Sequence, residues 1–383
     1  MQDLVRNRIT KCFRLPILLV LVMSWGRNAV SSEIYASELY ELRVKTIATG
    51  LNYPWGLDFL PDDGLIVTER SGAMLLFNIG ANKPEVVAGL PKISVSGQGG
   101  LMDVVLHPNF SENRMVYFSF VGGEDGLLGT EVARAKLIGS RLVDTEVIFQ
   151  ASPKSKGGRH FGSRLAFLGD KTLLVSLGDR GYRPNGQDLE THPGSIIRVM
   201  EDGGTPPDNP FYDNKAVTDQ IFTYGNRNVQ GLFWDELNDL IWATEHGPQG
   251  GCELNLIQPG KNYGWADITF GKNYIIGTKI GEGFYREDVE GPIFQWTPSN
   301  APSGLTVYRG EKFPAWAGNL FVGSLNLRLL SRLILDGQKV IGEERLLEHK
   351  IGRIRTVRTG PDGFLYILTD DNNGDILRIE PHL

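Results

Sequence analysis

Cysteine is almost absent from this chain of 383 residues, which contains only Cys12 and Cys252. Cys12 lies within an N-terminal leader, so Cys252 stands alone in the mature protein and an intrachain disulfide is excluded. A cysteine cluster that holds zinc is excluded for the same reason. An exported chain without disulfides has to be stabilised by its core or by bound ions.

The chain also lacks a cluster of basic residues. Its formal net charge is −6, and this acidic balance argues against nucleic acid as a partner. Single arginines can still bind a small anion. The hydrophobic content of 41% is that of a globular protein, long enough for one large β domain or two ordinary ones.

Long hydrophobic runs are missing as well, apart from the short stretch Leu15–Trp25. Four basic residues precede this stretch and small residues follow it, which is the pattern of a secretory signal peptide. A spanning helix needs about 20 apolar residues, so a retained anchor is the less favoured alternative. We predict a signal peptide over residues 1–31, no membrane anchor after its cleavage, and a periplasmic or secreted protein over residues 32–383.

The last missing feature is sustained helical periodicity. Short alternating apolar segments are separated by Gly, Pro, Asp and Asn, which predicts an all-β protein. A unit of glycine, apolar strand, turn and second apolar strand occurs six times. Units of this size cannot bury their own faces, so they predict a six-bladed β-propeller of four-stranded antiparallel blades. The units begin near Trp55, Gly100, Gly157, Gly231, Gly304 and Arg355.

Such a ring has to be closed between the two ends of the chain. The N-terminal strand over 42–51 is placed to complete the last blade beside the C-terminal strand over 376–381. One domain over residues 32–383 results. A pair of β-sandwich domains is the alternative, but it leaves the recurring unit unexplained.

The stretch from Gly157 to Gly181 carries the first candidate for catalysis. His160 precedes one apolar run, Asp179 follows the next, and the turn Gly169–Asp170 joins the two runs. A hairpin with this turn brings the two ends together, so His160 and Asp179 can meet as an oriented general base. Taken alone, the stretch favours the interpretation that both are ordinary loop residues.

Three further motifs place polar or charged side chains where units begin, and the two that contain arginine suggest an anionic ligand. Gln98 lies in a glycine-rich turn before the second unit, Arg227 and Asn228 precede the fourth, and Arg353 and Arg355 open the sixth at strand spacing. Residues two apart on a strand share a face, and two arginines on one face favour an anion. Surface salt bridges and a tight glycine turn are the alternative interpretations of these motifs.

A loop after the fourth unit offers oxygen ligands for a hard cation. Gly247 and Pro248 lie in the segment EHGPQGG, with Glu253 and Tyr263 following. Carbonyl and carboxylate oxygens are the ligands that Ca²⁺ prefers, although no EF-hand spacing is present.

Taken together and in order, these motifs resemble the soluble PQQ-dependent aldose sugar dehydrogenases, relatives of soluble quinoprotein glucose dehydrogenase. The resemblance covers essentially the whole mature chain. It rests on PWGLDFLPDDGLIVTERSG, GQGGLMDVVLHP, HFGSRLAF with SLGDRG, YGNRNVQG, EHGPQGG, GKNYGW, WTPSNAPSG and GRIRTVR.

The resemblance implies oxidation of an aldose at C1 to the lactone, with PQQ and Ca²⁺ as cofactors and an external electron acceptor. It assigns His160 as the base and Asp179 as its support. Cofactor contacts are implied for Gln98, Arg227, Asn228, Tyr274, Leu325, Asn326, Arg353 and Arg355. Calcium is implied at the carbonyls of Gly247 and Pro248, with a second, structural calcium at Glu253 and Tyr263.

One position departs from the family. Some relatives carry a lysine that contacts the cofactor where this chain has Asn326. A cation is lost there, and Lys272 or Arg328 is a candidate to replace it. A calcium-dependent lactonase and a non-catalytic carbohydrate- or protein-binding propeller are the competing functions. A lactonase of this fold would hold its metal with inward Asp, Asn and Glu side chains, whereas this chain assembles arginines and a histidine.

Overall fold

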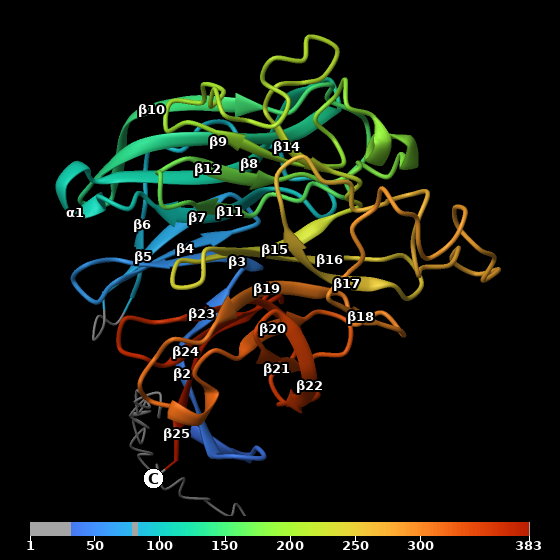
Figure 1. Cartoon of the computed structure of the whole chain (residues 1–383). Coiled ribbons are helices and arrows are strands. Elements are labelled where there is room, and N and C mark those ends of the chain that lie inside the picture. Colours follow the sequence, from blue (N-terminus) through green and yellow to red (C-terminus); the bar gives the residue numbers. More distant parts are fainter. Residues whose placement is uncertain (1–31, 79–82, 383) are drawn as a thin grey trace, which may run out of the picture.

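Six antiparallel sheets lie around a central axis in the computed structural model, which describes residues 32–78 and 83–382 (Figure 1). This six-bladed β-propeller confirms the predicted fold class. Helix is limited, within the described ranges, to α1 (Phe110–Asn113) and the 3-10 turns η1 (Arg183–Gln187) and η2 (Pro314–Trp316). No helix there is long and apolar enough to cross a membrane. The predicted signal peptide lies outside the described residues.

Five blades each take four strands from one continuous stretch of chain, and the first strand of each blade contacts that of the next around the axis. The first two blades contain β3 (Pro54–Phe59), β4 (Leu65–Glu69), β5 (Ala73–Phe77) and β6 (Glu85–Val86), then β7 (Leu101–Leu106), β8 (Met115–Glu124), β9 (Leu127–Ile138) and β10 (Arg141–Gln150). The next three contain β11 (Leu165–Phe167), β12 (Leu173–Ser176), β13 (Ser195–Val199) and β14 (Ile221–Tyr224); β15 (Val229–Asp235), β16 (Leu240–Glu245), β17 (Cys252–Ile257) and β18 (Phe294–Trp296); and β19 (Pro302–Val307), β20 (Leu320–Ser324), β21 (Leu330–Asp336) and β22 (Lys339–Leu346).

The sixth blade joins the two ends of the chain, as predicted. β23 (Ile354–Thr359), β24 (Leu365–Thr369) and β25 (Gly374–Pro381) are followed by β2 (Glu41–Leu51), which pairs antiparallel with β25. The sequence did not predict β1 (Ser32–Ala36), which adds a fifth strand at the outer edge.

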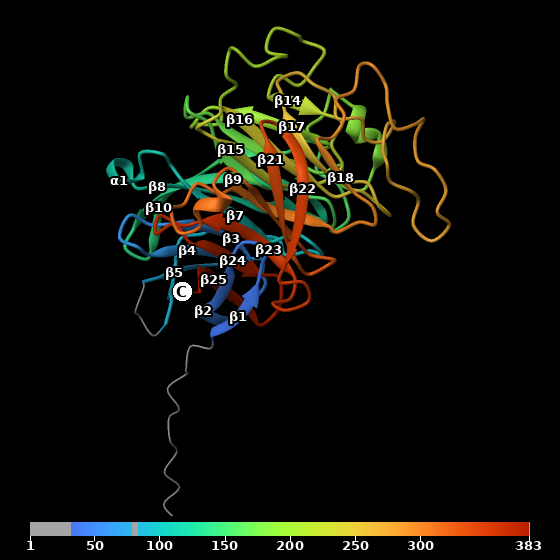
Figure 2. The ribbon, with the colours of Figure 1, turned by 60° about the horizontal axis from the view of Figure 1, so that its bottom comes forward.

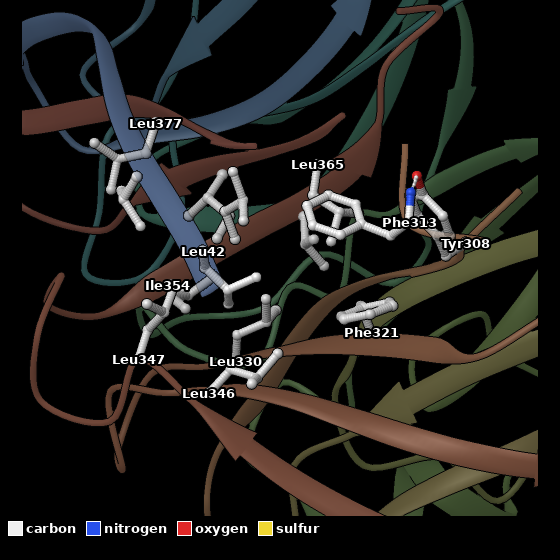
Figure 3. Packing of buried hydrophobic residues seen from close by; sticks show 14 of the residues in the cluster. Leu42, Tyr308, Phe313, Phe321, Leu330, Leu346, Leu347, Ile354, Leu365 and Leu377 are labelled. Carbon is white, nitrogen blue, oxygen red and sulfur yellow. Dashed lines mark hydrogen bonds between the residues drawn. The ribbon is translucent and has the colours of Figure 1, made fainter. Parts of the chain in front are cut away.

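The core is divided into apolar clusters between neighbouring blades. The alternation along each strand turns one set of side chains toward each adjacent blade, so no blade buries its faces alone. Figure 3 shows the cluster between the fifth and sixth blades, where Leu42 of β2 packs near Phe313 and Phe321. Trp316 stacks on Phe313 with ring centroids 4.3 Å apart.

The predicted hairpin of the third blade is present as β11 and β12, paired antiparallel. The end of β12 passes so close to the preceding loop that a Cβ on Gly178 would lie 2.1 Å from the carbonyl oxygen of His160. Only glycine permits this approach, and it brings the residues before β11 against those after β12. The long connection between β17 and β18, in orange, extends outward from the ring (Figure 2).

Candidate active site

A cavity of about 820 Å³ opens where the innermost strands of the blades begin. Its volume is in the range of small-molecule sites, which span roughly 300–1,000 Å³. Each of the six blades contributes residues to the lining of this cavity. From the first blade to the sixth, these include Trp55, Gln98, Phe161, Asn228, Ala301 and Arg353.

His160 and Asp179 meet beside this cavity. Nδ1 of His160 lies 2.6 Å from Oδ1 of Asp179, and both side chains are buried. The neighbours Phe161 and Gly162 line the cavity, whereas His160 and Asp179 are not among its lining residues. The backbone of His160 has a positive φ of 55° and donates its N–H to the Gln98 side chain at 2.8 Å.

Trp265, which the sequence reasoning did not single out, holds the other oxygen of the carboxylate. Its indole Nε1 donates to Oδ2 of Asp179 at 2.8 Å, and the backbone N–H of Gly181 donates to Oδ1. The carbonyl of Trp265 in turn accepts a bond from Gln187 of η1. The inserted segments after β12 and β17 therefore orient the carboxylate together.

The two groups of this pair have shifted pKa values. Burial lowers the pKa of His160 and outweighs the opposing effect of Asp179, while the positive charges of Arg227 and Arg159 lower it further. Burial alone would raise the pKa of Asp179. The hydrogen bond to His160, the charge of His160 and the hydrogen bond from the N–H of Gly181 outweigh this effect and lower the pKa overall. Near neutral pH the imidazole is therefore neutral and its partner ionised, which leaves Nε2 free to accept a proton.

Arg353 and Arg355 meet on one carboxylate. Oδ2 of Asp370 accepts bonds from Nη2 of Arg353 at 2.8 Å and Nη2 of Arg355 at 3.2 Å. Arg355 and Asp370 are buried, whereas 43% of the Arg353 side chain is exposed, so the ion pair constrains Arg355 more strongly than Arg353. Nε of Arg355 and Oδ1 of Asp370 have no hydrogen-bond partner among the described residues, so polar capacity remains for a ligand.

Arg227, Asn228 and Gln98 are positioned by neighbouring backbone. The guanidinium of Arg227 donates to the carbonyl oxygens of His246 at 2.8 Å and Gly247 at 3.2 Å. Asn228 accepts from the N–H of Gly162 at 3.1 Å. Asn228 and Gln98 line the cavity, and Arg227 lies behind it, beside a smaller one.

Tyr274, Leu325 and Asn326 also line the cavity. The amide of Asn326 is already engaged by a neighbouring loop, since Nδ2 donates to the carbonyl oxygen of Ser299, between β18 and β19, at 2.7 Å. Of the two candidates for the missing cation, Lys272 lines the cavity, whereas Arg328 is not among its lining residues.

Arg70 is a cation of the cavity that the sequence analysis missed. Its guanidinium lies over the Tyr53 ring, 4.1 Å from the centroid, and it lines the cavity. Neither an ion pair nor a side-chain hydrogen bond joins it to another residue of the described ranges. Stacking fixes a guanidinium without spending its N–H donors, so Arg70 can direct them to a ligand. Its place directly after β4, at the same end of the blade as the start of β3, was the available signal.

A buried arginine ties the blades together beneath this cavity. Arg164 donates to Oδ1 of Asp103 at 3.1 Å, to the carbonyl oxygens of Gln230 and Arg355, and lies over the ring of Trp55. The ring of Trp55 is thereby held in place, and it also forms a wall of the cavity.

The loop after β16 contributes Pro248 and His246 to the cavity wall. His246 is partly buried, and desolvation of its imidazole together with the charges of Arg355 and Arg227 lowers its pKa to about 3. Nε2 of this neutral imidazole finds no partner among the described residues. The carbonyl oxygen of Gly247, one of the two expected calcium ligands, accepts from Arg227 in the present arrangement.

Glu253 faces a second carboxylate that the sequence reasoning overlooked. Glu245 of β16 is paired directly opposite Glu253 of β17, and both line the small cavity together with Tyr263. Burial raises the pKa of both groups; the charge of Glu245 raises the pKa of Glu253 further, and the charge of Asp179 raises that of Glu245. Like charges opposite each other on neighbouring strands are destabilising, so oxygen ligands in this arrangement fit a cation. The described residues contain no group of three or more His, Cys, Asp and Glu side chains around a common point.

Comparison with known proteins gives a consistent result. A family model described as glucose / sorbosone dehydrogenase matches residues 51–378. Aldose sugar dehydrogenase YliI of Escherichia coli is 39% identical over 92% of this chain and 96% of its own. The apo-form structure of the soluble Escherichia coli aldose sugar dehydrogenase covers 89% of this chain and all of its own with a TM-score of 0.86. The PQQ-bound aldose sugar dehydrogenase of Streptomyces coelicolor is 29% identical with a TM-score of 0.73, covering 92% of this chain and all of its own.

Proposed function

The chain belongs to the glucose / sorbosone dehydrogenase family, and on this premise we propose that it oxidises aldose sugars at C1 to the lactone with PQQ as cofactor. The observation that carries the proposal is the buried pair of His160 and Asp179 beside a cavity lined by arginines. A base and a site for an acidic cofactor are thereby adjacent. The PQQ-bound Streptomyces coelicolor relative supports the choice of cofactor.

The residues of the cavity fit PQQ, a flat quinone with three carboxylates. Arg353, Arg355 and Arg70 offer guanidinium donors, and the unpartnered Nε2 of His246 offers another polar atom. The ring of Trp55 supplies a flat apolar wall. Gln98, Asn228, Tyr274, Leu325 and Asn326 complete the set of cofactor contacts that we propose. When bound, PQQ supplies an acceptor for the hydride of the sugar C1.

The protein's own part in the reaction is proton transfer. Nε2 of neutral His160 takes the proton of the C1 hydroxyl as hydride leaves the same carbon. The carboxylate of Asp179 fixes the tautomer with the proton on Nδ1 and stabilises the imidazolium that forms. Base catalysis of this kind typically contributes about 10²–10⁴-fold.

We also propose that calcium binds at two places. The carbonyl oxygens of Gly247 and Pro248 would hold one ion at the cavity wall, where it would polarise a bound carbonyl. Glu245 and Glu253, with Tyr263 beside them, would hold a second ion of structural role. The facing carboxylates of Glu245 and Glu253 support this assignment, since burial of two like charges is costly without a counter-ion.

We also propose that the protein is exported and that it passes electrons to an external acceptor. The leader over residues 1–31 supports export to the periplasm or the medium, with an external electron acceptor. A lactonase function is less well supported, because among the described lining residues Asp370 is the one carboxylate and it is paired with arginines.

Reconstitution tests the proposal. Protein freed of cofactor is loaded with PQQ and Ca²⁺, passed through gel filtration and assayed for dye reduction with glucose and other aldoses. We expect quinone absorbance to stay with the protein and dye reduction to require sugar. No retained quinone, together with no dye reduction by any aldose, would exclude the proposed function.

A further inference from the structure

A glycine-rich loop carries His160, and its backbone has few restraints of its own. Gly157 and Gly158 precede Arg159 and His160, and Gly162 follows them. A Cβ built on Gly157 would meet nothing within 4 Å, so packing does not hold this end of the loop. Glycine also has more conformational freedom than any other residue. The position of His160 therefore depends on contacts that other segments supply.

Arg180 supplies two of these contacts. Its Nη2 donates to the carbonyl oxygen of Gly157 at 2.6 Å, and its Nη1 donates to the carbonyl oxygen of Arg159. No other hydrogen bond from the described residues reaches these two oxygens. The carbonyl oxygen between them, that of Gly158, accepts the backbone N–H of Gln98 at 2.7 Å. Arg180 and Gln98 together thus hold three successive carbonyl groups of the loop.

The same guanidinium packs on the residue that follows His160. Cζ of Arg180 lies 3.6 Å from the ring centroid of Phe161, which is buried and lines the cavity. A guanidinium over an aromatic face is a favourable contact. The side chain of Arg180 therefore restrains the loop both before and after His160.

The charge of Arg180 is buried without an ion pair in the described ranges. Its side chain lies in a residue that is only 8% exposed, and its Nε finds no hydrogen-bond partner there. Burial lowers its pKa to about 10, and the charge of Asp179 opposes this effect only in part. By contrast, the buried Arg198 pairs with Asp170 and Asp208. Burying an unpaired charge is costly, which indicates that the contacts of Arg180 serve more than stability.

The turn that carries Arg180 is itself fixed and strained. Its φ of 57° lies in the left-handed region, where residues other than glycine are uncommon. Asp179 donates its backbone N–H to the carbonyl oxygen of Arg227 at 2.8 Å, and Gly181 donates its own to Oδ1 of Asp179. Strained residues persist where their surroundings fix them, and they cluster at functional sites. One turn thus carries both the carboxylate that holds the imidazole of His160 and the guanidinium that holds its backbone.

We propose that Arg180 is a positioning residue for His160, which fixes the loop so that the imidazole stays on Asp179. This role rests on the proposed function, in which His160 takes the proton of the sugar. Arg180 is not among the residues that line the cavity, so it acts through His160. A base has to stay within hydrogen-bond reach of the proton it accepts, so a loosened loop lowers the rate more than the affinity for substrate.

Exchange of the imidazole proton tests this role without cofactor or sugar. The full chain is labelled with ¹⁵N-histidine, and the Nδ1–H resonance of His160 is identified by its loss in His160→Ala. We expect this proton to exchange with water about tenfold faster in Arg180→Met than in wild type, because the loop opens more often. Arg180→Lys should lie between them, since lysine keeps the charge but loses the planar fork, and it carries the test if Arg180→Met does not fold. Equal exchange in wild type and in both variants would overturn the proposal.

Steady-state kinetics of the PQQ-loaded enzyme give the second measure. Arg180→Met should lower kcat by about tenfold, the worth of lost charge-assisted hydrogen bonds, with KM changed by less than about twofold. Arg198→Met is the matched control, because Arg198 is a buried arginine of the same blade outside the cavity lining. We expect this control to lower the Tm and to leave proton exchange and kcat as in wild type.

Two outcomes separate the positioning role from its alternatives. Equal changes of proton exchange and kcat in Arg180→Met and Arg198→Met would overturn the proposal, by assigning the effect to lost stability of the blade. An inactive wild type that still shows the expected difference in proton exchange would contradict the proposed function alone. The assignment of Arg180 to the loop of His160 would then stand.

Discussion

The indole of Trp265 donates to Oδ2 of Asp179 at 2.8 Å, on the opposite oxygen from His160. Trp265 lies 86 positions from Asp179 in the chain, and His160 lies 19 positions from it. Two separate segments of the chain therefore hold the carboxylate from two sides. A carboxylate fixed in this way can orient the imidazole without moving toward solvent. The geometry of the base therefore depends on the inserted loop after β17 as much as on the hairpin that carries His160.

Asp179→Asn should lower kcat by about a hundredfold or more, because an amide no longer fixes the tautomer of His160. The pH profile gives a second measure. Activity requires neutral His160, so it is lost as pH falls through the pKa of that residue. Asp179 raises this pKa, so its removal should move the acid limb to lower pH. A limb that moves to higher pH would contradict the assigned coupling.

Trp265→Phe should keep the apolar packing and remove one hydrogen bond to the carboxylate. We expect kcat to fall by roughly tenfold, the worth of one bond to a charged group, with a smaller change in KM. Steady-state kinetics of the PQQ-loaded enzyme measure this. Trp234→Phe is the matched control, because the Trp234 indole bonds to Asp239, outside the cavity lining. A KM effect without a kcat effect would argue against a positioning role for Trp265.

The sequence predicted the ring and its closure because each blade repeats one pattern and the last one is completed by an identifiable strand. It also predicted that His160 and Asp179 would be close, since one short hairpin separates them. Trp265 and Glu245 could not be found in this way. Their partners are set by loop paths and by cross-strand register, and a local pattern contains neither.

The charge of the cavity was also predicted incompletely. Arg353 and Arg355 were expected to be free for an anion, but Asp370 lies between them. Asp370 comes directly after β24, which is the second strand of the same blade. No spacing rule connects this aspartate to the two arginines. Among the described arginines that line the cavity, Arg70 is the one without an ion pair, and in the sequence it stands out only as a residue at a strand end.

Arg70→Gln should weaken PQQ binding by about 10–100-fold, the worth of charge-assisted hydrogen bonds at a desolvated site. Quenching of tryptophan fluorescence on titration with PQQ measures the Kd directly, without turnover. Arg70→Lys should lie between wild type and Arg70→Gln, since it keeps the charge but loses the planar fork. Arg328→Gln is the control and should bind as wild type does. Equal Kd values for Arg70→Gln and Arg328→Gln would remove Arg70 from the cofactor site.

The facing carboxylates of Glu245 and Glu253 predict a stability that depends on pH and on cations. Their folded-state pKa values are raised above the ordinary value of 4.5. The cation-free protein is therefore fully stabilised below that value, and it loses stability as pH rises through the raised pKa values. In EDTA the Tm should fall on going from acidic to mildly alkaline pH, and Ca²⁺ should restore it.

Glu253→Gln provides the matched test of this cation site. Removing one of the two charges should raise the Tm in EDTA at alkaline pH and abolish the increase that Ca²⁺ gives to wild type. Differential scanning calorimetry at two pH values measures both effects. A Ca²⁺ response of the same size in wild type and in Glu253→Gln would locate the stabilising ion elsewhere.

The most direct test of the account is a single turnover without an external acceptor. Wild type and His160→Ala are loaded with PQQ and Ca²⁺, mixed anaerobically with glucose, and followed through the absorbance of the bound quinone. We expect both proteins to retain the quinone, wild type to reduce it on addition of sugar, and His160→Ala to do so about 10²–10⁴-fold more slowly. Equal rates in the two proteins, or no reduction in wild type with any aldose, would contradict the account.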